Sequence, residues 1–215
     1  MIVGVVLAKN AQKAVEKIKS GEADLYEVRL DHFSSFDGLE ELEPFAPNLI
    51  FTFRSYEEGG RREASDEERL RVYKRVLELY PAYVDVGLNS GIAERVVKEA
   101  REKRVGVVLS YHNFEETPDF WELLGVVKAM EALEPDVMKI VTMARSLGDN
   151  LRIARLYEGR ENVVAFCMGS LGRLSRLISA LLAPFTYASL DEEAAPGQLT
   201  VEELRRAIEV VGDGR

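Results

Sequence analysis

The sequence predicts an α/β fold in which a single domain, residues 1–215, forms a (β/α)8 TIM barrel. Eight short apolar runs alternate with eight amphipathic stretches along the chain, and this alternation is typical of a parallel sheet covered by helices. Eight such units close into a barrel, although about 250 residues is the more usual length. The rival, an open doubly wound sheet, is disfavoured because the first strand–helix junction, VLAKNAQ, lacks a G-x-G-x-x-G phosphate loop.

The first half of the chain is expected to hold four strand–helix units. Its apolar runs are rich in β-branched and aromatic residues, which favour strands. These runs span residues 2–7, 24–30, 48–53 and 82–87. The stretches after them repeat apolar residues at helical spacing, and they cover about 10–20, 37–43, 66–79 and 91–103. Asp66 is a helix start signal at the third of these stretches.

The second half repeats the same pattern four times. Apolar runs predict strands at 105–110, 137–142, 163–168 and 185–189. Helices are expected at about 119–133, 147–158, 172–182 and 200–210. Thr117-Pro118 introduces the first of these helices, and Thr200 stands before two glutamates at the start of the last.

Composition and charge argue against several classes of function. The net charge is −9 and the Lys and Arg residues are dispersed, so we expect no nucleic-acid partner. The single cysteine, Cys167, excludes an intramolecular disulfide and a Cys-cluster zinc site, and we expect no metal. The N-terminal apolar run is too short for a signal peptide, and no stretch reaches the roughly 18 apolar residues of a membrane span. We therefore expect a cytoplasmic protein with no membrane association.

Polar residues gather on the second, third and fourth expected strands. Alternation places Glu27, Arg29 and Asp31 on one face of strand 24–30. Three charges inside a barrel require pairing with one another or with a ligand, and the sequence leaves both alternatives open. Arg54 ends the third strand before a Gly-Gly turn, and Asp85 lies between two valines of the fourth. Because barrel chemistry collects at the carboxyl ends of the strands, these residues are candidates for a site.

Lys139 and His112 are the strongest candidates for catalysis. Lys139 lies inside the apolar run VMKIVT, where a buried lysine must be ion-paired or must lose its proton, unless it reaches water from the strand end. A neutral amine is the nucleophile for Schiff-base chemistry. His112 follows the preceding strand, so both side chains are expected at one barrel mouth. An imine beside a histidine base suits removal of a proton alpha to a carbonyl.

The last third of the chain carries a candidate anion site. The segment MGSLGRLSRL, residues 168–177, is a Gly-rich turn leading into a helix, with Arg173 and Arg176 in the first turns. Helix N-termini and arginines both favour carboxylate or phosphate groups. The following loop, residues 191–200, contains Gln198 after a Pro-Gly turn.

Six segments of the chain carry a family pattern in the same order, over about residues 2–210. They are YEVRLDHF, FTFRSYEEGG, LSYHNFEETP, MKIVTMARSLGDNLRI, MGSLGRLSRL and AAPGQLT. Together they resemble the type I 3-dehydroquinate dehydratase family, hydro-lyases that form a Schiff base in the shikimate pathway of aromatic amino acid biosynthesis. One such segment is a weak signal, whereas six in register are a specific one.

The resemblance implies a role for each matching residue. Lys139 would form an imine with the C3 ketone of 3-dehydroquinate, His112 would move protons as general base and then acid, and Glu58 would orient the imidazole. The remaining residues would bind substrate: Arg176, Glu27, Arg29, Arg54 and Gln198 through carboxylate or hydroxyl groups, and Phe114, Met143 and Met168 along the apolar side. The product would be 3-dehydroshikimate, no cofactor would be needed, and the family resemblance suggests a homodimer.

Three departures from the family pattern accompany this resemblance. Ala194 stands where many members have a serine, and Gly87 replaces an acid often found two residues after the aspartate of the fourth strand. The barrel is expected to lack the N-terminal hairpin that closes its floor in longer members.

Two other functions remain as alternatives. A Schiff-base aldolase on the same barrel would need a phosphate site and no histidine beside the lysine, so the SYHNF and APGQ segments argue against it. A non-catalytic barrel that binds a polyhydroxy acid is hard to reconcile with both Lys139 and His112.

Overall fold

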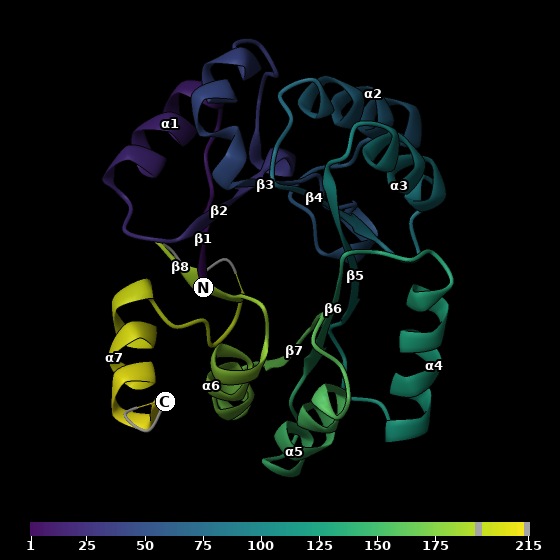
Figure 1. Ribbon diagram of the computed structural model, residues 1–215, viewed down its shortest axis with the longest axis vertical. Helices are drawn as coiled ribbons and strands as arrows, with labels where there is room; N and C mark the ends of the chain where they lie inside the picture. The colour runs from purple at the N-terminus through teal and green to yellow at the C-terminus, as the bar shows by residue number, and fades with distance from the viewer. Residues whose placement is uncertain (192–194, 213–215) are drawn as a thin grey trace.

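The predicted (β/α)8 barrel is confirmed. The computed structural model describes residues 1–191 and 195–212, so Ala194 lies outside the described residues. Eight parallel strands form the barrel wall and the helices lie around it (Figure 1). The strands are β1 (Ile2–Val6), β2 (Leu25–Arg29), β3 (Leu49–Thr52), β4 (Tyr83–Gly87), β5 (Gly106–Asn113), β6 (Val137–Met143), β7 (Val163–Met168) and β8 (Thr186–Ser189).

Seven α-helices and five short 3₁₀-helices connect the strands of the described chain. The α-helices are α1 (Ala11–Ser20), α2 (Asp66–Leu77), α3 (Ala93–Glu102), α4 (Phe120–Glu131), α5 (Gly148–Ala154), α6 (Arg173–Leu182) and α7 (Val201–Gly212). The 3₁₀-helices are η1 (Leu30–His32), η2 (Leu39–Asn48), η3 (Tyr56–Glu58), η4 (Arg155–Tyr157) and η5 (Ser170–Gly172). None of these helices combines the length and apolar character needed to cross a bilayer.

Two expectations about these elements are wrong. The stretch 37–43 is not an α-helix, because Pro44 and Pro47 remove backbone donors and η2 forms instead. The fifth strand runs on to Asn113, so His112 lies within β5 and not after it. Helix α2 begins at Asp66, as expected, and Ser65 caps it by accepting a hydrogen bond from the Glu68 amide.

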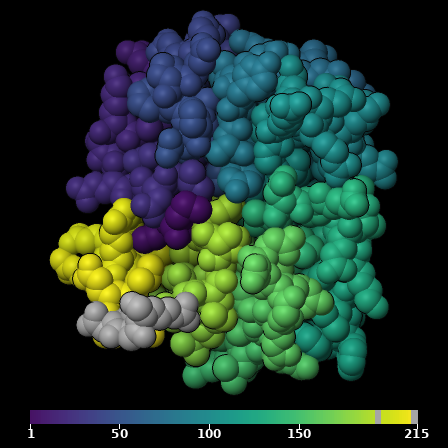
Figure 2. Space-filling view, in the orientation of Figure 1, coloured from purple at the N-terminus to yellow at the C-terminus, as the bar shows by residue number. Residues whose placement is uncertain are grey.

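The backbone ladder is continuous from β7 through β1 to β8. β1 pairs with both β2 and β8, while β7 and β8 stand at the two ends of the hydrogen-bonded order. Across this β7–β8 seam the rings of Phe166 and Tyr187 lie 6.3 Å apart. In the space-filling view the first residues, in purple, lie at the surface near α7, in yellow (Figure 2).

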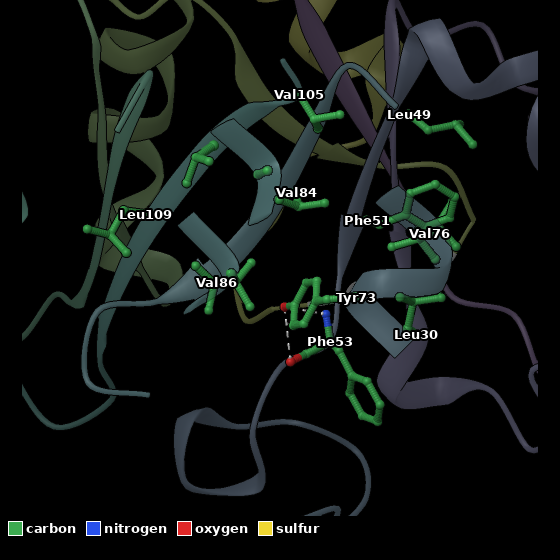
Figure 3. Close-up of a cluster of buried hydrophobic side chains, with 14 of the residues drawn as sticks. Leu30, Leu49, Phe51, Phe53, Tyr73, Val76, Val84, Val86, Val105 and Leu109 are labelled. Carbon is green, nitrogen blue, oxygen red and sulfur yellow. Dashed lines mark hydrogen bonds between the residues drawn. The ribbon is translucent and has the colours of Figure 1, made fainter. Parts of the chain in front are cut away.

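The core has two layers separated by the barrel wall. Side chains at alternate strand positions fill the barrel interior, among them Val108, Val137, Val164 and Phe185. The other face of each strand packs against the helices (Figure 3). This alternation, which has a period of two, also decides which polar side chains point into the barrel.

Tyr73 of α2 ties the outer layer to the ends of two strands. Its hydroxyl accepts a hydrogen bond from the Phe53 amide at 3.1 Å (Figure 3) and donates one to the carbonyl oxygen of Asp85. The carboxyl ends of β3 and β4 are therefore held in fixed register, and this is where Arg54 and Asp85 lie.

Candidate active site

One cavity lies at the carboxyl ends of the strands and opens to solvent there. Most of the predicted site residues line it. The lining as a whole comes from six of the eight strands, from η3 and α6, and from loops at the same end of the barrel. The lining residues are Val5, Glu27, Arg29, Arg54, Glu58, Gly59, His112, Phe114, Lys139, Val141, Phe166, Met168, Arg176, Tyr187, Ala195 and Gln198. The cavity therefore lies at the end of the barrel where the sequence predicts a site.

Lys139 of β6 is buried and ion-paired. Its side-chain nitrogen donates to Glu27 Oε1 and to Asp85 Oδ2, both at 3.0 Å, and the residue is 4% exposed. The pairing resolves the alternatives that the sequence left open. Lys139 does not reach water from a strand end, and it lies against two carboxylates inside the barrel. Glu27 likewise has a partner within the barrel, since Thr52 donates to Glu27 Oε1 at 2.9 Å.

Asp85 connects Lys139 to Arg54. The Arg54 guanidinium donates to Asp85 Oδ1 at 2.8 Å and to Ser110 Oγ at 2.6 Å, and Ser110 donates to Asp85 Oδ1 at 2.7 Å. Burial alone would raise the pKa of Asp85, but Arg54 and Lys139 outweigh burial and hold this pKa below its ordinary value. Asp85 is therefore an anion at neutral pH, and it neutralises part of the charge of both cations.

His112 faces the same cavity from β5. Its ring stacks on Phe114 with centroids 6.1 Å apart, and its buried Nδ1 has no hydrogen-bond partner among the residues that the structure describes. Burial, then Arg54 and Lys139, lower its pKa well below 6.5, and Asp85 opposes them only in part. At neutral pH the imidazole is therefore uncharged, as a general base must be.

Glu58 of η3 lines the cavity but forms no hydrogen bond with His112. Its carboxylate accepts from Ser55 Oγ at 3.3 Å and lies 3.9 Å from Arg54 Nη1. Burial raises the pKa of Glu58, while Arg54 lowers it in part. Gly87 of β4 leaves the space for this carboxylate, because a Cβ there would stand 2.0 Å from Glu58 Oε2.

Arg176 of α6 and the loop after β8 close the other side of the cavity. Arg176 is almost fully buried, with its guanidinium carbon 4.5 Å from the centre of the Phe166 ring. Its Nη2 donates to the carbonyl oxygen of Pro196 at 3.4 Å, and the Gly169 amide donates to the same oxygen at 2.9 Å. These bonds place Gln198 at the cavity. The other arginine of the predicted anion site, Arg173, is exposed and does not line the cavity.

The remaining predicted residues divide into those that line the cavity and one that does not. Arg29 lines it and forms a two-bond ion pair with Asp31, at 2.8 and 2.9 Å. Phe114, 44% exposed, stands at the mouth, and Met168 lies inside. Met143 is not a lining residue, because its sulfur lies against Gly169, 3.2 Å from where a Cβ would stand.

Sequence reasoning missed six lining residues: Val5, Gly59, Val141, Phe166, Tyr187 and Ala195. The period of two along each strand could have found two of them, since Val141 is two residues from Lys139 and Phe166 two from Met168. Among the described residues, no group of three or more His, Cys, Asp or Glu side chains is placed to hold a metal ion.

Comparisons with known proteins agree with this geometry. A family model described as type I 3-dehydroquinase matches residues 3–215. The chain is 59% identical over 215 residues to the 3-dehydroquinate dehydratase of Thermococcus gammatolerans, and both chains are covered completely. It is 51% identical over 217 residues to the enzyme of the same name from Pyrococcus abyssi, again with complete coverage of both.

Solved structures show the same likeness. The 3-dehydroquinate dehydratase of Geobacillus kaustophilus superposes with a TM-score of 0.88 at 25% identity, covering 99% of this chain and 91% of that one. The type I enzyme of Clostridium difficile, with covalently modified comenic acid, gives 0.87 at 24% identity, covering 100% and 92%. The second match, at its lower identity, supports the fold alone.

Proposed function

The chain belongs to the type I 3-dehydroquinase family, and on that premise we propose that it acts through an imine between Lys139 and its substrate. Full-length identity to proteins named 3-dehydroquinate dehydratase assigns the activity: dehydration of 3-dehydroquinate to 3-dehydroshikimate in the shikimate pathway. The proposal concerns the chemistry by which the residues of this cavity perform it.

One observation carries the proposal: Lys139 and His112 reach a single cavity from adjacent strands. β5 pairs with β6 so that Ser110 stands opposite Lys139 and His112 opposite Val141. The period of two then turns both functional side chains to the inside of the barrel, one above the other. A substrate carbon bonded to the lysine would therefore present its neighbouring carbon to the imidazole.

The first step forms the imine. In the resting site Lys139 Nζ donates to Glu27 and Asp85, so it must release a proton before it attacks, and these carboxylates are acceptors already bonded to it. The amine adds to the C3 carbonyl and the resulting carbinolamine loses water. The protonated imine then withdraws electrons from C2, whose proton in the free ketone is too weakly acidic for fast removal.

His112 would move the protons of the elimination. Its neutral imidazole takes the C2 proton, and the electrons of that C–H bond form an enamine. The imidazolium then protonates the C1 hydroxyl, which leaves as water while the enamine electrons form the C1–C2 double bond. Water finally hydrolyses the conjugated imine and frees Lys139. Proton transfer by a positioned base contributes about 10²–10⁴-fold to such a rate.

The surrounding residues would bind and orient the substrate. We assign the carboxylate to Arg176, whose burial beside Phe166 favours a strong charged hydrogen bond. Glu27, Arg29, Arg54 and Gln198 would hold hydroxyl groups, and Phe114 and Met168 the apolar side. Met143 would support the wall from behind Gly169. Glu58 would orient His112 once substrate is bound, since hydrogen bonds in a catalytic site often tighten only in the complex.

The experiment that tests this function is borohydride trapping. Incubation of the protein with 3-dehydroquinate and borohydride should add one ligand-derived mass at Lys139, and Lys139→Met should abolish the adduct. Lys128→Met, on α4 outside the cavity, is the matched control and should leave it unchanged. His112→Ala should still form the adduct but lose about 10²–10⁴-fold in turnover, followed by ultraviolet absorbance of the conjugated product. Near-normal turnover in His112→Ala would contradict the acid–base assignment.

The homodimer implied by family resemblance is also a proposal. Leu147, Leu151, Leu171 and Leu174 are exposed side chains of α5, η5 and the start of α6. Asn150 joins two of these segments, because its side-chain nitrogen donates to the carbonyl oxygens of both Leu147 and Leu171. Exposed leucines grouped in this way are typical of a protein interface.

A further inference from the structure

Tyr187 is a buried residue of the cavity to which neither the sequence nor the proposed mechanism gives a role. It lies on β8 opposite Val3 of β1, is 3% exposed and lines the cavity. Its ring packs between Phe185 and Phe166, with centroids 5.9 and 6.3 Å away. These neighbours fix the ring, so the phenol has one defined position.

The face of this ring covers the proposed reactive atom. Lys139 Nζ lies 3.7 Å from the ring centroid, while Glu27 and Asp85 bind the same nitrogen from other directions. A cation over an aromatic face is held there by the charge distribution of the ring. Because the hydroxyl lies on the edge of that ring, it is close to any substrate carbon that Nζ carries.

The hydroxyl of Tyr187 has no partner in the described structure. It is a buried polar atom without a hydrogen bond, whereas buried phenols ordinarily find one. Burial, then the charges of Glu27 and Asp85, raise the pKa of this phenol well above 10. The phenol therefore keeps its proton at neutral pH. It can donate a hydrogen bond to an incoming acceptor, or accept one.

We propose that Tyr187 is a substrate-binding residue whose hydroxyl donates a hydrogen bond to the C4 hydroxyl of 3-dehydroquinate. The inference rests on the proposed imine at C3, because that bond brings C4 next to the ring. The C3 oxygen leaves as water when the imine forms, so the oxygen on C4 is the neighbouring acceptor that persists. The unsatisfied phenol then gains its partner only when substrate is present.

The test removes the oxygen and leaves the ring. Tyr187→Phe should raise KM for 3-dehydroquinate about three- to tenfold, the range expected for one neutral hydrogen bond, with kcat changed by about twofold or less. The melting temperature should stay the same or rise, because an unsatisfied buried group has been removed. Product formation is followed by ultraviolet absorbance and stability by thermal unfolding.

Tyr157→Phe is the matched control. Its buried hydroxyl donates to the Ala165 carbonyl oxygen and accepts from the Ala165 amide, both at 2.8 Å, outside the cavity. This variant should melt at a lower temperature with KM unchanged, the opposite of Tyr187→Phe.

Failure of the proposed imine and failure of the proposed hydrogen bond give different results. A wild-type protein that gives no borohydride adduct at Lys139 refutes the imine, and the role of Tyr187 with it. An adduct at Lys139 together with an unchanged KM in Tyr187→Phe refutes only the hydrogen bond, and leaves the phenol as a packing group.

Discussion

At the scale of single residues, Gly87 shows how a missing side chain shapes the site. A Cβ at this position would stand 2.0 and 2.2 Å from the two carboxylate oxygens of Glu58. We expect Gly87→Ala to displace Glu58, because a carboxylate at the end of a flexible side chain moves more easily than the barrel wall. If Glu58 orients His112, kcat should fall about tenfold or more, with the melting temperature little changed.

The control for this variant is Gly125→Ala. Gly125 lies on α4, and an added Cβ would have no neighbour within 4 Å. Steady-state kinetics should show no effect there, and stability should rise slightly because alanine favours the helix. Full activity in Gly87→Ala would show that Glu58 is not needed where it stands.

His112 gives the site a predictable response to pH. Its pKa lies well below 6.5 because of burial, Arg54 and Lys139. As pH falls, the neutral base persists until this lowered value is reached, so the acid limb of kcat/KM should lie below pH 6.5. The unfolded chain binds this proton first, so the same group makes folding stability fall as pH decreases below about 6.5.

The measurement for this prediction is a kcat/KM profile together with an NMR titration of the imidazole. The chain has only two histidines, and His112→Asn assigns the signal. An acid limb centred above pH 6.5 would show that a different group limits the reaction.

At the scale of elements, the loop after β8 depends on its contact with the turn after β7. Gly197 has φ +73°, and a Cβ there would stand 2.4 Å from the carbonyl oxygen of Gly169. Gly197→Ala should therefore push the loop away from Gly169 and Arg176 and displace Gln198 from the cavity. We expect a KM raised about tenfold, which corresponds to the loss of about 1.4 kcal/mol of binding, and a lower melting temperature.

Gly159→Ala separates backbone strain from this contact. Gly159 has a similar φ of +70°, but nothing lies within 4 Å of an added Cβ. It should lose about 1–2 kcal/mol of stability from the left-handed conformation alone, while KM measured by the same assay stays unchanged. Equal effects on KM in the two variants would contradict a specific role for the loop.

The elements themselves could largely be predicted from the sequence. All eight strands lie where apolar runs predicted them, because strands buried on both faces form nearly continuous apolar runs. The helix expected at 37–43 failed because its apolar spacing was weighed without Pro44 and Pro47, which stop α-helical hydrogen bonding. The end of β5 was misplaced because the half-buried polar residues 111–113 look like a loop in sequence.

At the scale of the whole molecule, the barrel brings together residues that the sequence keeps far apart. Strand order made the proximity of Lys139 and His112 predictable. The ion-pair partners of Lys139 could not be predicted, because Glu27 is 112 positions away in the sequence. Several other charged residues of the barrel could equally have paired with the lysine. Tyr187 was overlooked because nothing in its short strand, TYAS, links it to Lys139, and only closure of the barrel sets its ring over that residue of β6.

The assembly can be tested through the exposed leucines. Leu151→Arg together with Leu174→Arg places charge on the surface formed by α5 and α6, where both side chains are exposed. If two copies meet there, the mass measured by light scattering should halve, because desolvating an unpaired charge in an interface is unfavourable. Leu182→Arg, an exposed leucine at the end of α6, is the control. An unchanged mass would place the contact elsewhere.

The buried quartet of Arg54, Asp85, Lys139 and Glu27 holds two positive and two negative charges in one connected network. A protonated imine carries the same single positive charge as the ammonium it replaces, so formation of the imine would leave the quartet neutral. Chemical modifications of Nζ should therefore differ in their effect on stability according to whether they preserve its positive charge. Reductive methylation preserves the charge of Nζ and should leave the fold intact. Acylation removes this charge, leaves two buried carboxylates without their lysine partner and should therefore destabilise the barrel.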